Sequence, residues 1–361
     1  RPAGTTIGSN HIRYVGGEAT LRLTTDGPVS HVLDERLFSI IVSMAIVGPL
    51  VFWALWPWMW NDTLPRVQEY LNFHMNHVYY NIEYLHKNYF GPPSPRSYAP
   101  VLVFATVPTT TIVLFLVGGF DRLRALALRV VAAFRKERVA PGAARDRAET
   151  DLLLFLAFSA PLAVFVLLPR TPIFGGTKHW LPAYPFLAIF AGRGFDVVGE
   201  KILAAVERIK TDYQRTGVWA ALFAILALPP VIITRHSGVY GLATYMPFVG
   251  GNQGGADLGL NRQFWGYTTE QLAPYFAKYP RATVFLDDTA WDSWNRMVAE
   301  KRVPPTMQAV GAPSDAQIAI VQHELHMNEV DYDEWMAFGS PSPDYVLTHD
   351  GVPIISAYRR K

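Results

Sequence analysis

Cysteine is absent from the chain, and neither sign of charge is in clear excess. The lack of cysteine excludes disulfides, thiolate metal ligands and a cysteine nucleophile. A formal net charge of +2 over 361 residues gives no strongly basic surface, so we expect no nucleic-acid partner. Half of the residues are hydrophobic and they cluster in long runs, which excludes a soluble enzyme, a disordered chain and a small disulfide-rich scaffold.

Four long stretches without a charged residue predict membrane-spanning helices. They contain 24, 22, 18 and 18 residues, and roughly 18 or more apolar residues are enough to cross the hydrocarbon layer. A fifth uncharged stretch, WLPAYPFLAIFAG, is shorter, and a re-entrant or interfacial segment is the alternative interpretation. The predicted spans are residues 37–60, 99–120, 152–169, 180–192 and 217–234.

The distribution of Lys and Arg predicts how these spans are oriented. With five crossings, the segments 1–36, 121–151 and 193–216 share one side and carry 17 Lys and Arg in 91 residues. The loops 61–98 and 170–179 on the other side carry 5 in 48 residues. Because positively charged loops stay in the cytoplasm, we expect the first set inside. If the short fifth stretch did not cross, five of the basic residues would lie outside, so crossing is favoured.

These spans predict an α-helical polytopic membrane protein with about five transmembrane helices and a small C-terminal extracytoplasmic α/β domain. Residues 1–36 form a cytoplasmic N-terminal segment, and we expect the chain to begin within a longer protein, since no signal peptide precedes the first span. Residues 37–234 form the transmembrane domain, with 61–98 as an outer amphipathic loop. Within it, 195–214 is predicted as an amphipathic helix on the cytoplasmic membrane surface. Residues 235–361 form the external domain.

The C-terminal part alternates predicted strands and helices. The glycine-rich stretch 249–259 is predicted as a flexible linker, because it lacks the Lys-Ser/Thr ending of a phosphate-binding loop. Thr268 is predicted to cap the helix that follows it. The remaining order is typical of an α/β domain and ends in a hairpin that turns at Asp350-Gly351. The predicted elements are strand 282–286, helix 290–301, strand 317–322, helix 331–338 and hairpin 344–359.

The outer loop 61–98 is the densest group of reactive side chains, with several tyrosines, histidines and carboxylates. His74 and His77 are three residues apart and would share one helix face, with Glu83 or His86 as a further metal ligand. A surface helix with His and Tyr at headgroup depth explains the same pattern without a metal. The spacing HxxH also lacks the base of an HExxH motif. We therefore expect no metal site and no cofactor in this loop. Binding of a divalent ion stays open as the alternative.

A second group lies in the outer loop RTPIFGGTKHWLPAYP, which begins at Arg170. Its cations Lys178 and His179 lie at the mouth between two predicted spans, where cations can bind lipid phosphate. The glycines Gly175 and Gly176 let the backbone approach a ligand closely. Ordinary snorkelling of the long cationic side chains to the membrane surface is the alternative interpretation.

Three segments resemble membrane glycosyltransferases of the GT-C fold, such as the protein O-mannosyltransferases and the bacterial transferases that attach aminoarabinose to lipid A. The resemblance covers residues 57–272 and implies a bacterial cytoplasmic-membrane enzyme. Such an enzyme moves a sugar from a polyprenyl-phosphate donor to an unknown extracytoplasmic acceptor, which is a protein, lipid or glycan. It also contacts membrane lipid. The segments are PWMWNDTLPRVQEYLNFHMNHVYYNIEYLHKNYFGPPSPRSYAPVLVFATVP, GTKHWLPAYPFLAIFAG and GGNQGGADLGLNRQFWGYTTEQL.

The resemblance also implies roles for individual residues. The donor's phosphate gains negative charge as the sugar leaves, so it needs fixed cations. The residues expected to bind this phosphate are Lys178, Arg170 and His179. The residues expected to line the cavity on the acceptor side are His74, His77, Tyr80 and Tyr184.

The general base is expected to be a carboxylate that accepts the proton of the acceptor hydroxyl. In the family this carboxylate follows the first transmembrane helix, whereas the surroundings of Asp62 are similar to a later outer loop. We therefore expect the base upstream of residue 1, with Asp62 and Glu83 as the candidates inside this chain. Two other functions stay open, a transporter or flippase-like protein and a noncatalytic membrane scaffold. The absence of charge within the predicted spans disfavours a transport path.

Overall fold

The chain is mostly helical and divides into two compact units, which are described separately. One unit contains residues 1–77 and 117–158, and the other contains 78–116 and 159–361. The computed structural model describes residues 6–7, 10–15, 18–22, 35–135, 143–173, 175–206, 209 and 211–360.

The first unit begins with a small antiparallel sheet in the order β1-β2-β3, where the sequence predicted only a cytoplasmic segment. Helix α1 follows over most of the first predicted span, but its apolar part, Ile41–Leu55, is shorter than about 18 residues. Later in the chain, Arg122 in the helix over 109–134 donates a hydrogen bond of 2.8 Å from Nε to Asp151 in the helix over 143–167, and this contact joins the two helices. The elements are β1 (Thr6–Ile7), β2 (Asn10–Val15), β3 (Glu18–Arg22), α1 (Glu35–Leu55), η2 (Pro57–Met59) and α2 (Thr63–Met75).

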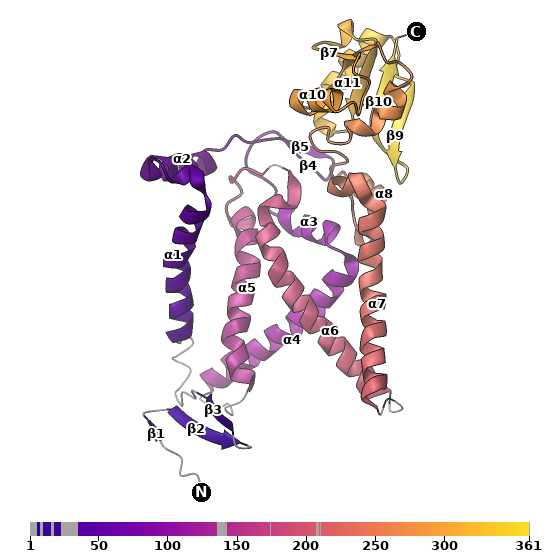
Figure 1. Cartoon of the computed structure of the whole chain (residues 1–361). Coiled ribbons are helices and arrows are strands. Elements are labelled where there is room, and N and C mark those ends of the chain that lie inside the picture. The colour runs from indigo at the N-terminus through magenta and orange to yellow at the C-terminus, as the bar shows by residue number, and fades with distance from the viewer. Residues whose placement is uncertain are drawn as a thin grey trace. The chain divides into compact units, whose positions relative to one another are not determined.

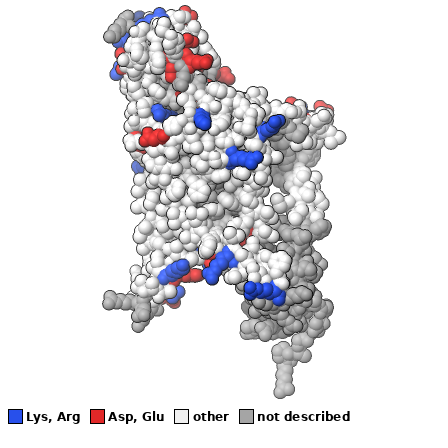
Figure 2. Space-filling model, turned by 180° about the vertical axis from the view of Figure 1, so that it is seen from behind, with Lys and Arg blue, Asp and Glu red and all other residues white. Residues whose placement is uncertain are grey.

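Two helical stretches among the described residues are long and apolar enough to cross a membrane (Figure 1). The first is Thr150–Leu167, in α5 (Ala143–Leu167), and the second is Asp212–Ala243, which contains α7 (Asp212–Ser237). They confirm the helices predicted at 152–169 and 217–234. Large apolar side chains on α7 are exposed, and Figure 2 shows a wide uncharged surface over the described helices. This surface suits contact with lipid.

The predicted span 99–120 is not one continuous helix. It consists of α3 (Tyr98–Thr106) and α4 (Thr109–Phe134), which are bent by 116° relative to each other. Val107 has an extended backbone between them, with ψ of 136°. A residue that precedes proline avoids the helical region, so Pro108 causes the break. If this bent pair counts as one span, the described residues contain up to three.

The predicted boundaries around 180–192 are also wrong. This stretch is divided between the 3-10 helix η3 (Gly176–Ala183) and α6 (Tyr184–Ala205), which continues past it. A separate amphipathic helix over 195–214 does not form, because α6 ends and α7 begins inside that range. Thr211 caps α7 by accepting a hydrogen bond from the Gln214 backbone, and the Gln214 side chain accepts one in return. This reciprocal cap sets the start of α7.

Helix α6 crosses α4 (Figure 1), and Gly194 on α6 lies directly against the α4 backbone at Leu114. A Cβ atom at this position would lie 1.9 Å from the carbonyl oxygen of Leu114, so any side chain forces the helices apart. Gly194→Ala is expected to lower stability by about 1–3 kcal/mol. Thermal unfolding in detergent measures the effect. Gly192→Ala is the control, because a Cβ there meets nothing within 4 Å, and equal melting temperatures for the two variants would contradict this packing.

The C-terminal domain is a five-stranded sheet in the order β7-β6-β8-β10-β9, with helices packed against it. Strands β7, β6 and β8 are parallel, whereas β10 is antiparallel to both of its neighbours. The central strand β8 is buried along its whole length, which explains its continuous apolar sequence. The predicted α/β order and the hairpin are confirmed, although β7 was missed. The strands are β6 (Thr283–Phe285), β7 (Gln308–Val310), β8 (Ile318–Gln322), β9 (Tyr345–His349) and β10 (Val352–Arg359).

Two local predictions for this region are wrong. The predicted flexible linker contains helix α8 (Gly251–Asp257), whose side chains Asn252 and Gln253 both bind Asp350. Thr268 does not cap a helix, because its hydroxyl accepts a hydrogen bond from Gln263 instead. Long-range contacts with Asp350 therefore hold α8, whereas a contact with a near neighbour occupies the Thr268 hydroxyl. The remaining helices are η4 (Gly238–Ala243), η5 (Pro247–Val249), η6 (Thr269–Leu272), α9 (Ala273–Phe276), α10 (Trp291–Ala299), η7 (Pro313–Asp315), η8 (Leu325–Met327) and α11 (Asn328–Phe338).

Glu334 on α11 is a buried carboxyl group in this domain. It is 0% exposed, and neither of its oxygens has a hydrogen-bond partner in the described part of the chain. Burial raises the pKa of Glu334 to about 9, and the charges of Asp287 and Asp331 add to the effect. The folded domain therefore keeps a proton that the unfolded chain releases at its ordinary pKa of 4.5.

The stability of the domain is consequently expected to fall as the pH rises from about 5 to 9. Glu334→Gln removes this titration. The free energy of unfolding of this variant should therefore fall less steeply with pH, with a slope smaller by up to about 1.4 kcal/mol per pH unit, the value for one proton. Urea unfolding in detergent at several pH values measures the slope. The exposed Glu329→Gln on the same helix is the control, and an unchanged slope in the Glu334 variant would contradict the expectation.

Candidate functional site

A cavity of about 310 Å³ lies in the second unit, between the ends of its helices and the segments that lead into the C-terminal domain. Its wall is formed by α3, the start of α6 and the end of α7. Residues of 241–246 and 260–265, Gly175 with the start of η3, and one residue of a short hairpin complete the wall. Polar and aromatic side chains from segments far apart in the sequence therefore meet here.

Glu83 is the carboxylate in the wall of this cavity. It is the middle residue of β4 (Ile82–Tyr84), which pairs with β5 (Lys87–Tyr89), and it is only 5% exposed. The hairpin is held against α8, because the backbone N–H of His86 donates to Gly259 and its ring nitrogen lies 2.8 Å from the Asp257 carbonyl. These contacts fix the strand that presents Glu83.

Other ionisable groups near Glu83 are held in their neutral forms. Burial raises the pKa of Glu324 to about 9, and the charges of Asp288 and Glu83 add to the effect. Tyr245 also lines the cavity, and burial followed by the effects of Tyr98 and Glu83 raises its pKa well above the ordinary value. At neutral pH the Tyr245 hydroxyl in the cavity wall is therefore neutral, and so is Glu324, which interacts electrostatically with Glu83 but does not line the cavity.

The amide Asn261 adds polar bonding capacity to the same wall. Its backbone carbonyl accepts a hydrogen bond of 2.7 Å from the Tyr245 hydroxyl. Its buried side-chain oxygen has no hydrogen-bond partner in the described part of the chain. Buried polar atoms normally have a partner, so this oxygen suits a ligand that donates a hydrogen bond, such as a hydroxyl group.

Lys178 is exposed and is not among the residues that line the cavity, but it contacts one of them. Its ammonium nitrogen is 4.9 Å from the centre of the Trp265 ring, and Trp265 itself lines the cavity. Burial lowers the pKa of Lys178. Gly175 allows this arrangement, because a Cβ atom there would lie 2.2 Å from the Trp265 ring. The close approach predicted at this glycine is thus made by a side chain of the same chain, and Lys178 is placed by a cation–π contact.

The other residues predicted for donor and acceptor binding are only partly assembled here. Tyr184 lines the cavity, as expected for an acceptor-side residue. Arg170 is exposed after the end of α5, and His179 packs its ring on Phe165 at 5.6 Å. Tyr80 is 47% exposed. None of these last three is among the residues that line the cavity.

Three predicted residues belong to the first unit. Asp62 is an exposed residue just before α2 and makes no capping hydrogen bond with its side chain. His74 lies on α2, but the helix ends at Met75, so His77 lies beyond it and the predicted shared helix face is wrong. Each histidine ring instead packs on Phe73. In the part of the chain that the structure describes, the His and carboxylate side chains that lie close enough together to hold a metal are those of His236, His349 and Asp350.

Several cavity residues were missed because they carry no local signal. Tyr98, Ser237 and Tyr245 are ordinary residues at helix ends and turns, and the fold alone brings them together. The pair Phe264-Trp265 precedes Gly266, and a search for aromatic pairs beside glycines would have found it.

The comparisons with known proteins found no matching family model, no matching curated protein and no matching solved structure.

Proposed function

We propose that this chain is a membrane-bound glycosyltransferase that moves a sugar from a polyprenyl-phosphate donor to an acceptor outside the cytoplasm. The observation that carries the proposal is the cavity itself. It combines a buried carboxylate, a tryptophan with a lysine over its face, and tyrosine and amide groups suited to sugar hydroxyls. The apolar helices α5 and α7 supply a surface for the lipid part of the donor.

The carboxylate of Glu83 is the proposed general base. The acceptor hydroxyl gives its proton to Glu83 while its oxygen forms a bond to the anomeric carbon of the sugar. The bond between this carbon and the phosphate oxygen breaks, and the electron pair leaves with the polyprenyl phosphate. Glu83 is favoured over Asp62 because it is buried in the cavity wall, whereas Asp62 is exposed.

Lys178 is the proposed cation for the donor phosphate. The leaving phosphate gains negative charge during the reaction, so a fixed ammonium group stabilises the transition state more than the ground state. The Trp265 ring beneath the ammonium orients it and offers an apolar face to the sugar ring. Exposed Arg170 contributes long-range attraction for the anionic donor.

The proposed location of the reaction follows from the charge pattern. Basic segments such as 121–151 are placed in the cytoplasm, and the domain 235–361 is placed outside. The cavity lies where α7 leads into that domain, so it would open at the outer face of the cytoplasmic membrane.

Transfer of a radiolabelled sugar tests the proposal directly. The chain, purified and reconstituted in vesicles, is supplied with polyprenyl-phosphate donors that carry different sugars, together with membrane and protein acceptors. Time-dependent, protein-dependent label in an acceptor supports the proposal. Absence of both donor binding and transfer with every donor would overturn it. The variants argued in the Discussion then assign the roles of single residues.

A further inference from the structure

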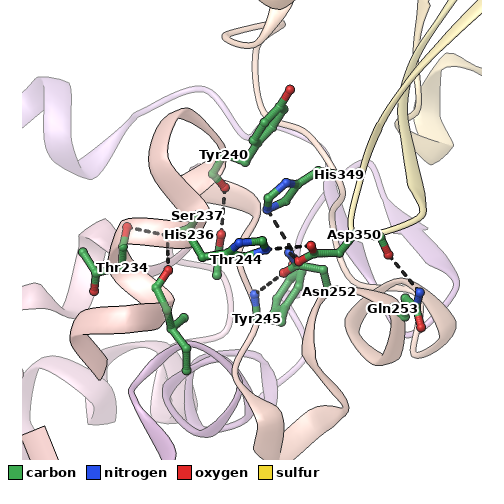
Figure 3. Close-up of polar contacts among 11 residues, drawn as sticks. Thr234, His236, Ser237, Tyr240, Thr244, Tyr245, Asn252, Gln253, His349 and Asp350 are labelled. Carbon is green, nitrogen blue, oxygen red and sulfur yellow. Dashed lines mark hydrogen bonds and ion pairs between the residues drawn. The ribbon is translucent and has the colours of Figure 1, made fainter. Parts of the chain in front are cut away.

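A cluster of two histidines and one aspartate joins the end of α7 to the hairpin β9–β10 (Figure 3). The ring nitrogen Nε2 of His236 lies 2.7 Å from one carboxylate oxygen of Asp350. The Nε2 of His349 lies 3.7 Å from the other oxygen. The three ligand atoms lie within 4.8 Å of one another. The cluster is thus assembled from residues more than a hundred positions apart in the sequence.

These distances suit a tetrahedral metal ion. Zinc binds histidine nitrogen and carboxylate oxygen at about 2.0–2.2 Å, which puts neighbouring ligand atoms about 3.3–3.4 Å apart. The two observed separations of 2.7 and 3.7 Å lie on either side of this value. Both imidazoles must rotate out of their stacked arrangement before all three atoms can bind one ion.

The surroundings hold the ligands in place as the outer shell of a metal site does. Asn252 donates a hydrogen bond of 2.8 Å to the carboxylate of Asp350. The ring of Tyr240 stacks on that of His349, with centres 4.3 Å apart. Asp350 and Gly351 have φ angles of 51° and 77°, as a tight hairpin turn requires, and this fixes the backbone beneath the carboxylate.

One ligand atom has no other bonding role in the structure. The Nε2 atom of His349 is buried and has no hydrogen-bond partner in the described part of the chain. The side chain is only 11% exposed. The ring of His349 also stacks on that of His236, with centres 5.3 Å apart, so its Nε2 atom lies near the Asp350 carboxylate and beside a second imidazole.

We propose that His236, His349 and Asp350 form a binding site for a divalent transition-metal ion, with Zn²⁺ as the preferred ion. Imidazole nitrogen with one carboxylate oxygen suits Zn²⁺ better than Ca²⁺ or Mg²⁺, which prefer oxygen ligands. Three protein ligands leave a fourth position for water, and the side chain of His236 is exposed enough to admit it. This inference is independent of the proposed sugar transfer.

The proposed ion would fasten the C-terminal sheet to the end of an apolar helix. His236 belongs to the last turn of α7, and the other two ligands belong to the turn of β9–β10. Asn252 also accepts a hydrogen bond of 2.8 Å from the backbone N–H of Tyr245, a residue of the cavity wall. Metal binding is therefore expected to stabilise the domain and this side of the cavity.

Zinc titration of the whole purified chain in detergent tests the site. After removal of metals with EDTA, isothermal titration with ZnCl₂ is expected to show one ion per chain, and added zinc is expected to raise the unfolding temperature. His349→Ala and Asp350→Asn are each expected to weaken zinc binding at least about tenfold, and Asn252→Ala about 10–100-fold. Asn also tolerates the turn conformation at position 350, so this variant keeps the hairpin.

The double variant His74→Ala, His77→Ala is the matched control, because it removes two histidines outside the cluster. It is expected to bind zinc like the unmodified chain. Absence of zinc binding, or binding that survives both His349→Ala and Asp350→Asn, would overturn the proposal and leave an ordinary His236–Asp350 ion pair. Loss of binding in the control variant alone would move the site to α2 and would overturn the proposal equally.

Discussion

Glu83→Gln is expected to lower the rate of sugar transfer by about 10²–10⁴-fold, the usual contribution of a positioned general base. Glutamine has nearly the same shape as glutamate but cannot take up the proton of the acceptor hydroxyl. Since Glu83 is 5% exposed and lies in a buried strand, little else in the cavity should change. The measurement is kcat/KM for labelled donor at matched protein levels in vesicles, with donor binding measured separately.

Asp62→Asn is the matched control, because Asp62 is the other carboxylate considered as base and it is exposed. It is expected to retain nearly normal transfer. If Asp62→Asn abolished transfer and Glu83→Gln did not, the roles would have to be exchanged. If both variants were active, neither Glu83 nor Asp62 would be the base. Circular dichroism of each variant checks that the fold is retained.

Lys178→Met is expected to lower transfer at least about tenfold, which corresponds to about 1.4 kcal/mol of lost transition-state stabilisation. Methionine keeps an apolar stem over the Trp265 ring but removes the charge that the leaving phosphate needs. Lys178→Arg keeps the charge with a different geometry, so it should retain part of the activity. Transfer rates at saturating donor separate the loss in kcat from a loss in KM.

Lys201→Met is the control for Lys178→Met, because Lys201 is an exposed lysine near the end of α6. It is expected to behave like the unmodified chain. A lysine that only snorkels to the membrane surface would give the same result at position 178, with normal transfer for both the methionine and the arginine variants. That result would remove Lys178 from the site.

The apolar helices could be predicted because their cause is local. The runs in α5 and α7 contain enough consecutive apolar residues to be helical and lipid-compatible by themselves. The α/β order of the C-terminal domain was also predictable, since β8 is an apolar run and the hairpin turn needs Asp350-Gly351. The size of the bend at Val107 was not predictable, because the uncharged run continues through Pro108 and only the structure shows two separate helices at 116°.

The site was predicted only in fragments. Glu83, Lys178 and Tyr184 could be selected from residue type and loop position, and the structure brings Glu83 and Tyr184 to one cavity. The partners that give them their chemistry are distant in sequence. Trp265 places Lys178, and Glu324 approaches Glu83 only through the packing of the hairpin and the C-terminal sheet.

The sequence by itself determined the apolar helices α5 and α7, the α/β character and final hairpin of the C-terminal domain, and the chemical types available for a site. These properties depend on composition and on contacts between near neighbours. Only the tertiary structure decided that the glycine-rich stretch 249–259 contains a helix. It alone decided that His77 leaves the helix of His74, and that His236 meets His349 and Asp350. The helix in the glycine-rich stretch and the cluster of His236, His349 and Asp350 both depend on contacts with Asp350 from segments far away in the chain, which local preferences cannot reveal.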